Sequence, residues 1–416
     1  MDPTTAKLFF AAGGAATGGG SGGTPLTEPL LFPCSQSTNY AYVHGIKTDG
    51  TYVGTYQLPT KAAYSAFFYN PYLVVQPMGY STMYVIDCNS MTLYGTISGC
   101  YQNGYQPWDS SGKYIYVRPT QYIDIVDIPN LTLTQTSYQG TPGYSGRSTA
   151  HATVGFANNG SSLFTSLQDM YYWTSGSNSS GYPLYIYSGS RSYSSSLLNS
   201  SQYEAGPGGN YSRNWGISCG NSNSIICSFG SNYYSAYPNG AIFGPHTPSS
   251  LNYGGSNYNV YFDSDDNNAR CGVNNGSYYL TVGGAALTTY NYEWRIGYYP
   301  NGATQNGSTV QDCGIKLKSK TQGGTSSGPY YYVQDGTFMC QINNSGYVAV
   351  AYFDQETYGL NTTNIRIKIL NGSTQVAQYT SSVSSSYVGG SSSYSRAALN
   401  GSGWTTNLLY SGTTYS

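Results

Sequence analysis

The chain alternates short runs of aromatic and β-branched residues with turns rich in Gly, Asn, Ser and Pro. Residues 67–77 (FFYNPYLVVQP) and 108–119 (WDSSGKYIYVRP) illustrate the unit, in which a polar turn leads into a strand-like run. Runs of about four to eight such residues, bounded by turn residues, predict half-buried β-strands rather than helices. The pattern predicts an all-β protein.

This turn-and-strand unit recurs along the whole chain. Its copies begin at Phe67, Trp108, Phe156, Gly220, Gly272, Ile342 and Leu399. The intervals of roughly 40 to 70 residues are those of β-propeller blades with loop insertions. We expect each copy to be one supersecondary unit that stacks on its neighbours.

The first two units divide further into four strands each. The first gives residues 62–69, 71–77, 81–88 and 91–98, and the second gives 105–110, 113–119, 121–128 and 131–138. In both, the third strand ends near an acidic residue, Asp87 or Asp127, and a turn follows. A four-stranded meander cannot bury both faces alone, so the copies must stack, and a ring removes their exposed edges. We expect the strand pair within residues 38–59 to complete the last blade beside the C-terminal strands.

These two units resemble blades of surface-layer-type β-propellers, through the segments SSGKYIYV and YIDIVDIPNLTLTQT. The resemblance covers residues 60–140 and implies a β-propeller of about seven four-stranded blades over residues 34–416. It implies an architecture and no ligand. A propeller-like N-terminal half followed by a β-sandwich from residue 250 onward is the alternative that the later pattern also permits.

The composition bears on the partners of the chain. Charged residues make up 8% of it, against about 25% in ordinary globular domains, and the net charge is -1. The chain has no basic stripe that could neutralise phosphates, which argues against nucleic acid and polybasic membrane contacts. It also has no apolar run of the length of a transmembrane helix.

Groups that could carry out catalysis are scarce. The three histidines, His44, His151 and His246, fall in different units, and no nucleophile elbow or phosphate loop occurs. Asp124 and Asp127 are candidate carboxylates for glycoside hydrolysis, but residues three apart on a strand point to opposite faces. We expect no catalytic residues and no enzyme activity, with a propeller hydrolase as the least favoured alternative.

One acidic cluster suggests a cation. Asp263, Asp265 and Asn267 alternate as in the first half of a calcium loop. Asn268 and Asn274 stand where such a loop has Gly and Glu, so an exposed turn is the alternative. No other cofactor is predicted. Eight cysteines occur without metal-binding spacing, and Cys88 with Cys100 could bridge neighbouring strands or remain buried thiols.

The aromatic residues suggest a binding surface. The chain has 48 Tyr, and flat rings surrounded by Asn, Ser and Gly are used by saccharide-binding surfaces. Packing between blades is the structural alternative for most of them. The candidate surface residues are Tyr171, Tyr172, Trp173, Tyr233, Tyr234, Tyr330 and Tyr331.

Residues 1–33 differ from the rest of the chain. An apolar run that contains Leu8, Phe9 and Phe10 is followed by the flexible sequence GGGSGGTP. This leader resembles the start of tailed-phage virion structural proteins, which implies that the apolar run inserts into a partner subunit as an anchor. A terminal tail without a function is the alternative.

Together these features predict a structural or adhesive virion component, such as a fibre, spike or decoration subunit, that is oligomeric in its assembly. It would dock on other virion or surface proteins through residues 1–33 and bind host glycans through its Tyr- and Asn-rich strands. The alternative is a secreted or cell-surface binding module, such as a lectin or surface-layer component. Both hypotheses predict a virion or extracellular location.

Overall fold

A computed structural model gives the arrangement of the chain. It describes residues 23–60, 63–77, 80–100, 106–107, 112–117, 122–139, 151–157, 163–169, 183–188, 199–204, 213–220, 225–230, 239–243, 246–247, 250–251, 260–261, 271–274, 277–283, 294–299, 311–317, 338–341, 347–354, 357 and 362–389. Within these residues the strands form seven four-stranded sheets and one two-stranded sheet, and neighbouring strands pair antiparallel.

The sheets are numbered here in chain order. The first holds β1 (Leu30–Leu31), β2 (Cys34–Gln36), β3 (Ala41–Lys47) and β4 (Tyr52–Gln57). The second holds β5 (Ala63–Tyr69), β6 (Tyr72–Pro77), β7 (Thr82–Asp87) and β8 (Thr92–Ser98). The third holds β9 (Gln106–Pro107), β10 (Lys113–Val117), β11 (Tyr122–Asp127) and β12 (Thr132–Gln139). The fourth holds β13 (His151–Ala157), β14 (Leu163–Asp169), β15 (Pro183–Ser188) and β16 (Asn199–Glu204).

The remaining sheets continue the series. The fifth holds β17 (Arg213–Gly220), β18 (Ile225–Gly230), β19 (Asn239–Phe243) and β22 (Val260–Tyr261), and the short pair is β20 (His246–Thr247) with β21 (Ser250–Leu251). The sixth holds β23 (Cys271–Asn274), β24 (Ser277–Gly283), β25 (Trp294–Tyr299) and β26 (Gln311–Leu317). The seventh holds β27 (Phe338–Gln341), β28 (Val348–Phe353), β29 (Asn364–Asn371) and β30 (Thr374–Ser382), and the 3-10 turn η3 (Ser385–Tyr387) follows it.

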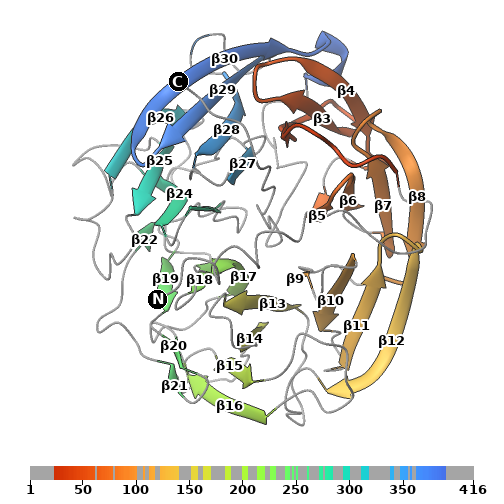
Figure 1. Ribbon diagram of the computed structural model, residues 1–416, viewed down its shortest axis with the longest axis vertical. Coiled ribbons are helices and arrows are strands. Elements are labelled where there is room, and N and C mark those ends of the chain that lie inside the picture. The colour runs from red at the N-terminus through yellow and green to blue at the C-terminus, as the bar shows by residue number, and fades with distance from the viewer. Residues whose placement is uncertain are drawn as a thin grey trace, which may run out of the picture.

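The sheets follow one another around a ring, and the last sheet lies beside the first (Figure 1). One apolar core joins Phe353 and Ile367 of the seventh sheet to Leu31 and Ile46 of the first and to Val75 of the second. A ring of antiparallel meanders that closes on its own first sheet is a β-propeller. The fold class predicted from the sequence is confirmed.

The predicted repeat matches the strands closely. In six of the seven predicted units, the strand-like run is the second strand of a sheet. These strands are β6, β10, β14, β18, β24 and β28. The unit that begins at Leu399 lies outside the described residues. The alternative of a β-sandwich from residue 250 onward is not observed among the described residues, because β23–β26 and β27–β30 are consecutive meanders like the others.

One prediction about ring closure was wrong. The strands within residues 38–59 do not pair with the last sheet, but form the first sheet together with β1 and β2. Both β1 and β2 pair with β3, through Leu30 with Lys47 and Cys34 with Val43. The physical reason is that Leu30, Leu31 and Phe32, which lie upstream of the expected body, are themselves buried in the core.

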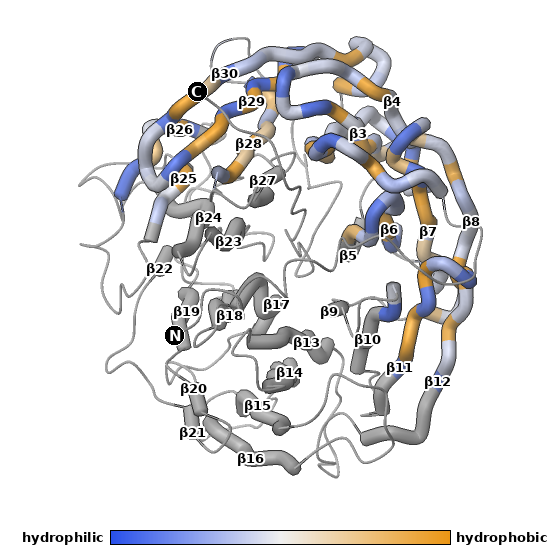
Figure 2. Tube along the Cα trace, in the orientation of Figure 1, coloured by the Kyte–Doolittle hydropathy of each residue, from blue (hydrophilic) through white to orange (hydrophobic). Residues whose placement is uncertain are grey.

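Strands inside the ring bury both of their faces. On β6, Leu73 and Val75 pack toward the first sheet, whereas Tyr72 and Val74 pack toward the third. On β28, Ala349, Ala351 and Phe353 join the core shared with the first sheet, whereas Val348, Val350 and Tyr352 join the core shared with the sixth. Figure 2 shows the resulting hydrophobic positions along β7 and β28, while β8 at the outer rim is paler. Alternation therefore assigns each face of a sheet to a different neighbour.

Two turns carry an apolar residue that locks adjacent sheets together. Met91 and Leu131 occupy equivalent places after β7 and β11, and both have φ 53°. A Cβ at Gly45 would lie 2.6 Å from Met91 Sδ, and a Cβ at Gly95 would meet Leu131. Glycine in the preceding sheet thus leaves the space that each side chain fills.

The acidic residues before these turns cap them. Asp87 Oδ1 accepts hydrogen bonds from Asn89 N and Nδ2, and Asp127 Oδ1 accepts from Asn130 N and Nδ2. Such Asx contacts favour a turn over continued strand. The acidic strand ends that the sequence shows in both units are turn caps.

The cysteine pair suggested by sequence spacing is not bonded. Neither Cys88 nor Cys100 forms a disulfide, and both side chains are buried. Cys88 packs in the core shared with the first sheet and Cys100 in the core shared with the third, so they lie on opposite faces of the second sheet. In the part of the chain that the structure describes, no helix is long and apolar enough to cross a membrane.

The contact between Leu131 and Gly95 predicts a coupled pair of mutations. Gly95→Ala should lower the free energy of unfolding by about 1–3 kcal/mol, because its Cβ overpacks against Leu131. In a Leu131→Ala background, Gly95→Ala should lower the free energy of unfolding by at least about 0.5 kcal/mol less than it does in the wild type. Urea denaturation of the four proteins in this cycle measures the coupling, and additive effects would contradict the packing.

Candidate functional site

Most residues predicted to bind ligands lie outside the described residues. This holds for the anchor Leu8, Phe9 and Phe10 and for the calcium candidates Asp263, Asp265 and Asn267. It also holds for the seven aromatic candidates, Tyr171, Tyr172, Trp173, Tyr233, Tyr234, Tyr330 and Tyr331. Among the described residues, no group of three or more His, Cys, Asp or Glu could hold a metal ion.

The two aspartates considered for hydrolysis are in different environments. Asp124 lies in β11 and is fully buried, and Asp127 ends the same strand half-buried. Both oxygens of Asp127 accept from Asn130 Nδ2, so this carboxylate is engaged in its turn.

The most developed polar site joins the first sheet to the end of the seventh. His44 on β3 is 0% exposed, and its ring lies 5.7 Å from the rings of Phe353 and Tyr387. His44 Nε2 lies 2.7 Å from Ser35 Oγ, and Nδ1 lies 2.6 Å from Thr55 Oγ1. Ser35 Oγ in turn donates to the Tyr387 carbonyl at 2.9 Å. We call Tyr52, Thr55, His44, Ser35 and Tyr387 the closure network.

The direction of the hydrogen bonds in this network follows from its carbonyl end. The Ser35 hydroxyl donates its only proton to Tyr387 O. Ser35 Oγ must therefore accept from His44, so the imidazole proton is on Nε2. Nδ1 then accepts from Thr55, whose oxygen accepts from Tyr52 Oη at 2.6 Å. The network is a single one-way chain around a neutral imidazole.

This geometry argues against a reactive Ser–His pair. A base that activates Ser35 would need to accept its proton, whereas here Nε2 donates toward Ser35. No carboxylate lies on Nδ1 to stabilise an imidazolium, because a threonine hydroxyl occupies that position. Burial lowers the pKa of His44 to about 3. The network holds two sheets together and leaves Ser35 unactivated.

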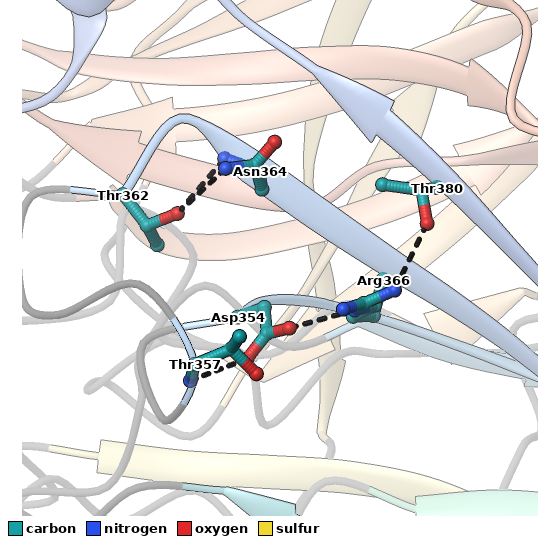
Figure 3. Close-up of polar contacts among 6 residues, drawn as sticks. All are labelled: Asp354, Thr357, Thr362, Asn364, Arg366 and Thr380. Atoms are coloured by element: carbon teal, nitrogen blue, oxygen red, sulfur yellow. Dashed lines mark hydrogen bonds and ion pairs between the residues drawn. The ribbon is translucent and has the colours of Figure 1, made fainter.

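A second polar cluster orders the loop between β28 and β29. Figure 3 shows Arg366 on β29 between Asp354 and Thr380, with Nε 2.6 Å from Asp354 Oδ2. Asp354 also accepts from Thr357 N at 3.0 Å, and its side chain is only 7% exposed. Burial acts to raise the pKa of Asp354, but the hydrogen bonds from Arg366 and Thr357 lower it below its usual range. The cluster is a satisfied ion pair that supports the loop.

The end of the leader forms a strap, residues 23–28, across the first two sheets. Leu26 N donates to Asn70 Oδ1 at 2.8 Å, and Asn89 Nδ2 donates to Thr24 O at 2.7 Å. Gly23 N donates to Tyr72 Oη, and Glu28 pairs with Lys47 at 2.6 Å. The leader upstream of residue 23 therefore starts from a fixed point beside the second sheet.

Tyrosine rings pack within a sheet, as Tyr72 and Tyr94 of the second sheet do, and between sheets, as Tyr56 of the first and Tyr84 of the second do. The rings of Tyr72 and Tyr94 are 4.5 Å apart, and those of Tyr56 and Tyr84 are 6.5 Å apart. Burial raises the pKa of Tyr72 to about 12, although Gly23 N–H donates to its oxygen, so it stays a neutral phenol. Tyr52 and Tyr94 expose 41% and 37% of their surface. Part of the tyrosine content packs sheets together, and part faces outward.

Sequence reasoning missed both the closure network and the strap. Ser35 and Tyr387 are 352 residues apart, and Leu26 and Asn70 are 44 apart, so no local spacing marks them. The only available signal was His44 in an otherwise apolar run, AYVHGIK, where a polar ring inside a core needs partners.

The closure network predicts an acid-sensitive contribution to stability. His44 has a pKa of 6.5 in the unfolded chain and of about 3 in the folded chain. Between these pH values the unfolded chain binds a proton at His44 and the folded chain does not. The contribution is thus complete above pH 6.5 and falls by up to about 1.4 kcal/mol per pH unit toward pH 3. His44→Gln, which keeps one donor and one acceptor, should remove this slope in urea denaturation from pH 7 to pH 4. Parallel stability curves for the two proteins would contradict the prediction, since Asp354 titrates in both.

Comparison with known proteins gives likeness of fold only. No family model matches the sequence, and no curated protein matches it. Among solved structures it is similar to the β-propeller domain of Cps50 (Swd1) from Myceliophteria thermophila, at 11% identity and TM-score 0.38, over 70% of this chain and 91% of that one. It is also similar to U3-55K, at 8% identity and TM-score 0.42, over 79% and 92%. Kluyveromyces lactis Hsv2 is similar at 9% identity and TM-score 0.40, over 83% and 94%. At these identities and TM-scores the likenesses carry no conclusion about function.

Proposed function

We propose that the protein is a non-catalytic β-propeller subunit of a virion or other extracellular assembly. Residues 1–22 attach it to a partner subunit, and the ring presents a binding surface outward. A fibre, spike or decoration subunit fits this description. A secreted or cell-surface lectin or surface-layer component shares the binding surface but does not require the anchor.

The observation that carries this proposal is the strap. An apolar, Gly-rich leader with no role would not need to be held, yet residues 23–28 bind the body through Asn70, Tyr72, Asn89 and Lys47. Terminal segments are seldom ordered unless something ties them down. A flexible tether that leaves the ring at a fixed point holds the ring within a short reach of its partner.

Four of the outer strands suit an uncharged ligand, whereas β16 carries Glu204 and β26 carries Asp312 and Lys316. β4, β8, β12 and β30 contain no Asp, Glu, Lys or Arg, and they are rich in Thr, Gln, Ser and Tyr. Exposed rings held in place by neighbours, such as Tyr94 on Tyr72, supply flat contact area with little loss of entropy. Neutral saccharides on a host surface match these hydroxyls and rings, whereas acidic polymers would find no cation on these strands.

Deleting residues 2–22 tests the anchor. The truncated protein should keep its thermal unfolding midpoint, because the strap and Leu30–Leu31 remain, but it should be lost from assembled particles. Quantitative gels of purified particles give the stoichiometry. The control is a scrambled leader of equal composition, which should also fail, and normal incorporation of the truncated protein would refute an anchor.

A glycan array tests the binding surface. The protein should bind neutral saccharides in preference to sialylated or sulfated ones, and Tyr94→Ser should weaken binding by about tenfold, near the 1–1.5 kcal/mol of one stacked ring. Tyr40→Ser, which removes a similarly exposed ring outside these strands, is the matched control and should bind like the wild type. An array without signal would remove the adhesive role and leave the scaffold role.

A further inference from the structure

The strap is bound almost entirely through its main chain. The body contributes Asn70 Oδ1 and Nδ2, Tyr72 Oη and Asn89 Nδ2, and the strap contributes backbone groups of residues 23, 24 and 26. We call these three body residues the track. Asn70 contacts both the N–H and the carbonyl of Leu26, as a neighbouring strand would. The track therefore accepts an extended peptide.

Selectivity of the track falls on one position. A Cβ at residue 23 would lie 3.2 Å from Tyr72 Oη and 3.3 Å from Pro71 Cγ, so a glycine fits there best. Thr24 and Pro25 are exposed, and the track side chains carry no charge. The track thus prefers an uncharged extended peptide with glycine at its start, and the strap of any copy of this chain satisfies this equally.

The strap can leave the track without opening the core. Glu28 is held on β3 by Lys47, and Leu30 and Leu31 are buried beyond it. Exposed Thr27 separates this fixed part from Leu26. Rotation near Thr27 would move residues 23–26 away and break the contacts at the track, together with the packing of the half-buried Leu26 side chain on the edge of the core.

We propose that in the assembled protein the strap of one copy lies in the track of a neighbouring copy. The inference rests on the proposed assembly function. Exchange of an identical element preserves every contact of the closed form and adds a link between copies, so its cost is confined to the hinge. The isolated chain favours its own strap, because the effective concentration within one molecule is high, and crowding in an assembly favours exchange.

Two variants with complementary defects test the exchange. The first lacks residues 2–26 but keeps its track, and the second carries Asn70→Ala and Asn89→Ala but keeps its strap. In sedimentation velocity, the wild-type chain should self-associate as its concentration rises. The dissociation constant of each variant alone should be at least about tenfold higher than that of the wild type. An equimolar mixture should form one-to-one dimers. Asn371→Ala, at the exposed end of β29, is the control and should associate like the wild type.

The opposite results would overturn the proposal. A mixture without dimers excludes exchange, because in it the free track has no strap of its own to compete, and a track variant that associates as strongly as the wild type excludes it as well. Thermal unfolding of both variants checks that the ring is folded. Failure of strap exchange would not refute the anchor. The anchor is tested separately, by whether the chain that lacks residues 2–22 is incorporated into particles, and that chain keeps both its strap and its track.

Discussion

The contact between the first and last sheets is the constraint on which the rest of the ring depends. Each sheet in the well-packed part has two apolar faces, as β6 and β28 show, so a ring left open would expose one face at each end. Burial of Phe353 and Ile367 against Leu31 and Ile46 removes both faces from water at once. The closure network adds a polar contact across the same junction, because the Ser35 hydroxyl that bonds His44 also donates to the Tyr387 carbonyl.

A low content of charged residues is compatible with this fold because β-bulges protect the outermost strands of the sheets. Outer strands without charge are open to pairing with other chains. In three sheets, however, the outermost strand carries an extra residue at the equivalent place, Val53, Tyr94 or Val376, where the register shifts. Such bulges interrupt the row of backbone groups that a new strand would use. The surface can therefore stay neutral and rich in hydroxyls, as contact with neutral groups requires, without becoming an aggregation site.

The fold was largely predictable from the sequence, whereas the site was not. Strand positions such as β7 and β11 follow from alternation and turn residues within about ten residues of each other, which is local information. Asp87 and Asp127 were visible as a repeated feature, but their role as turn caps needed coordinates. His44, Ser35 and Tyr387 meet only because the ring closes, and a change of topology would separate them without altering any local pattern. The same holds for the strap, since an asparagine such as Asn70 is an ordinary turn residue until Leu26 is laid against it.

The leader and the fold share residues, and this would couple the proposed anchor to the stability of the ring. The segment that leaves the ring at Gly23 becomes core within ten residues, at Leu30 and Leu31, and pairs with β3 beside the closure network. A pull on the leader is carried first by the hydrogen bonds of the track and then by Glu28 on Lys47, and only afterwards by the paired strand. The weak contacts thus lie outermost and the strong ones innermost. A tether built in this order can be rearranged at the track without loss of the ring, which is the property that a subunit needs if it is to join an assembly after it has folded.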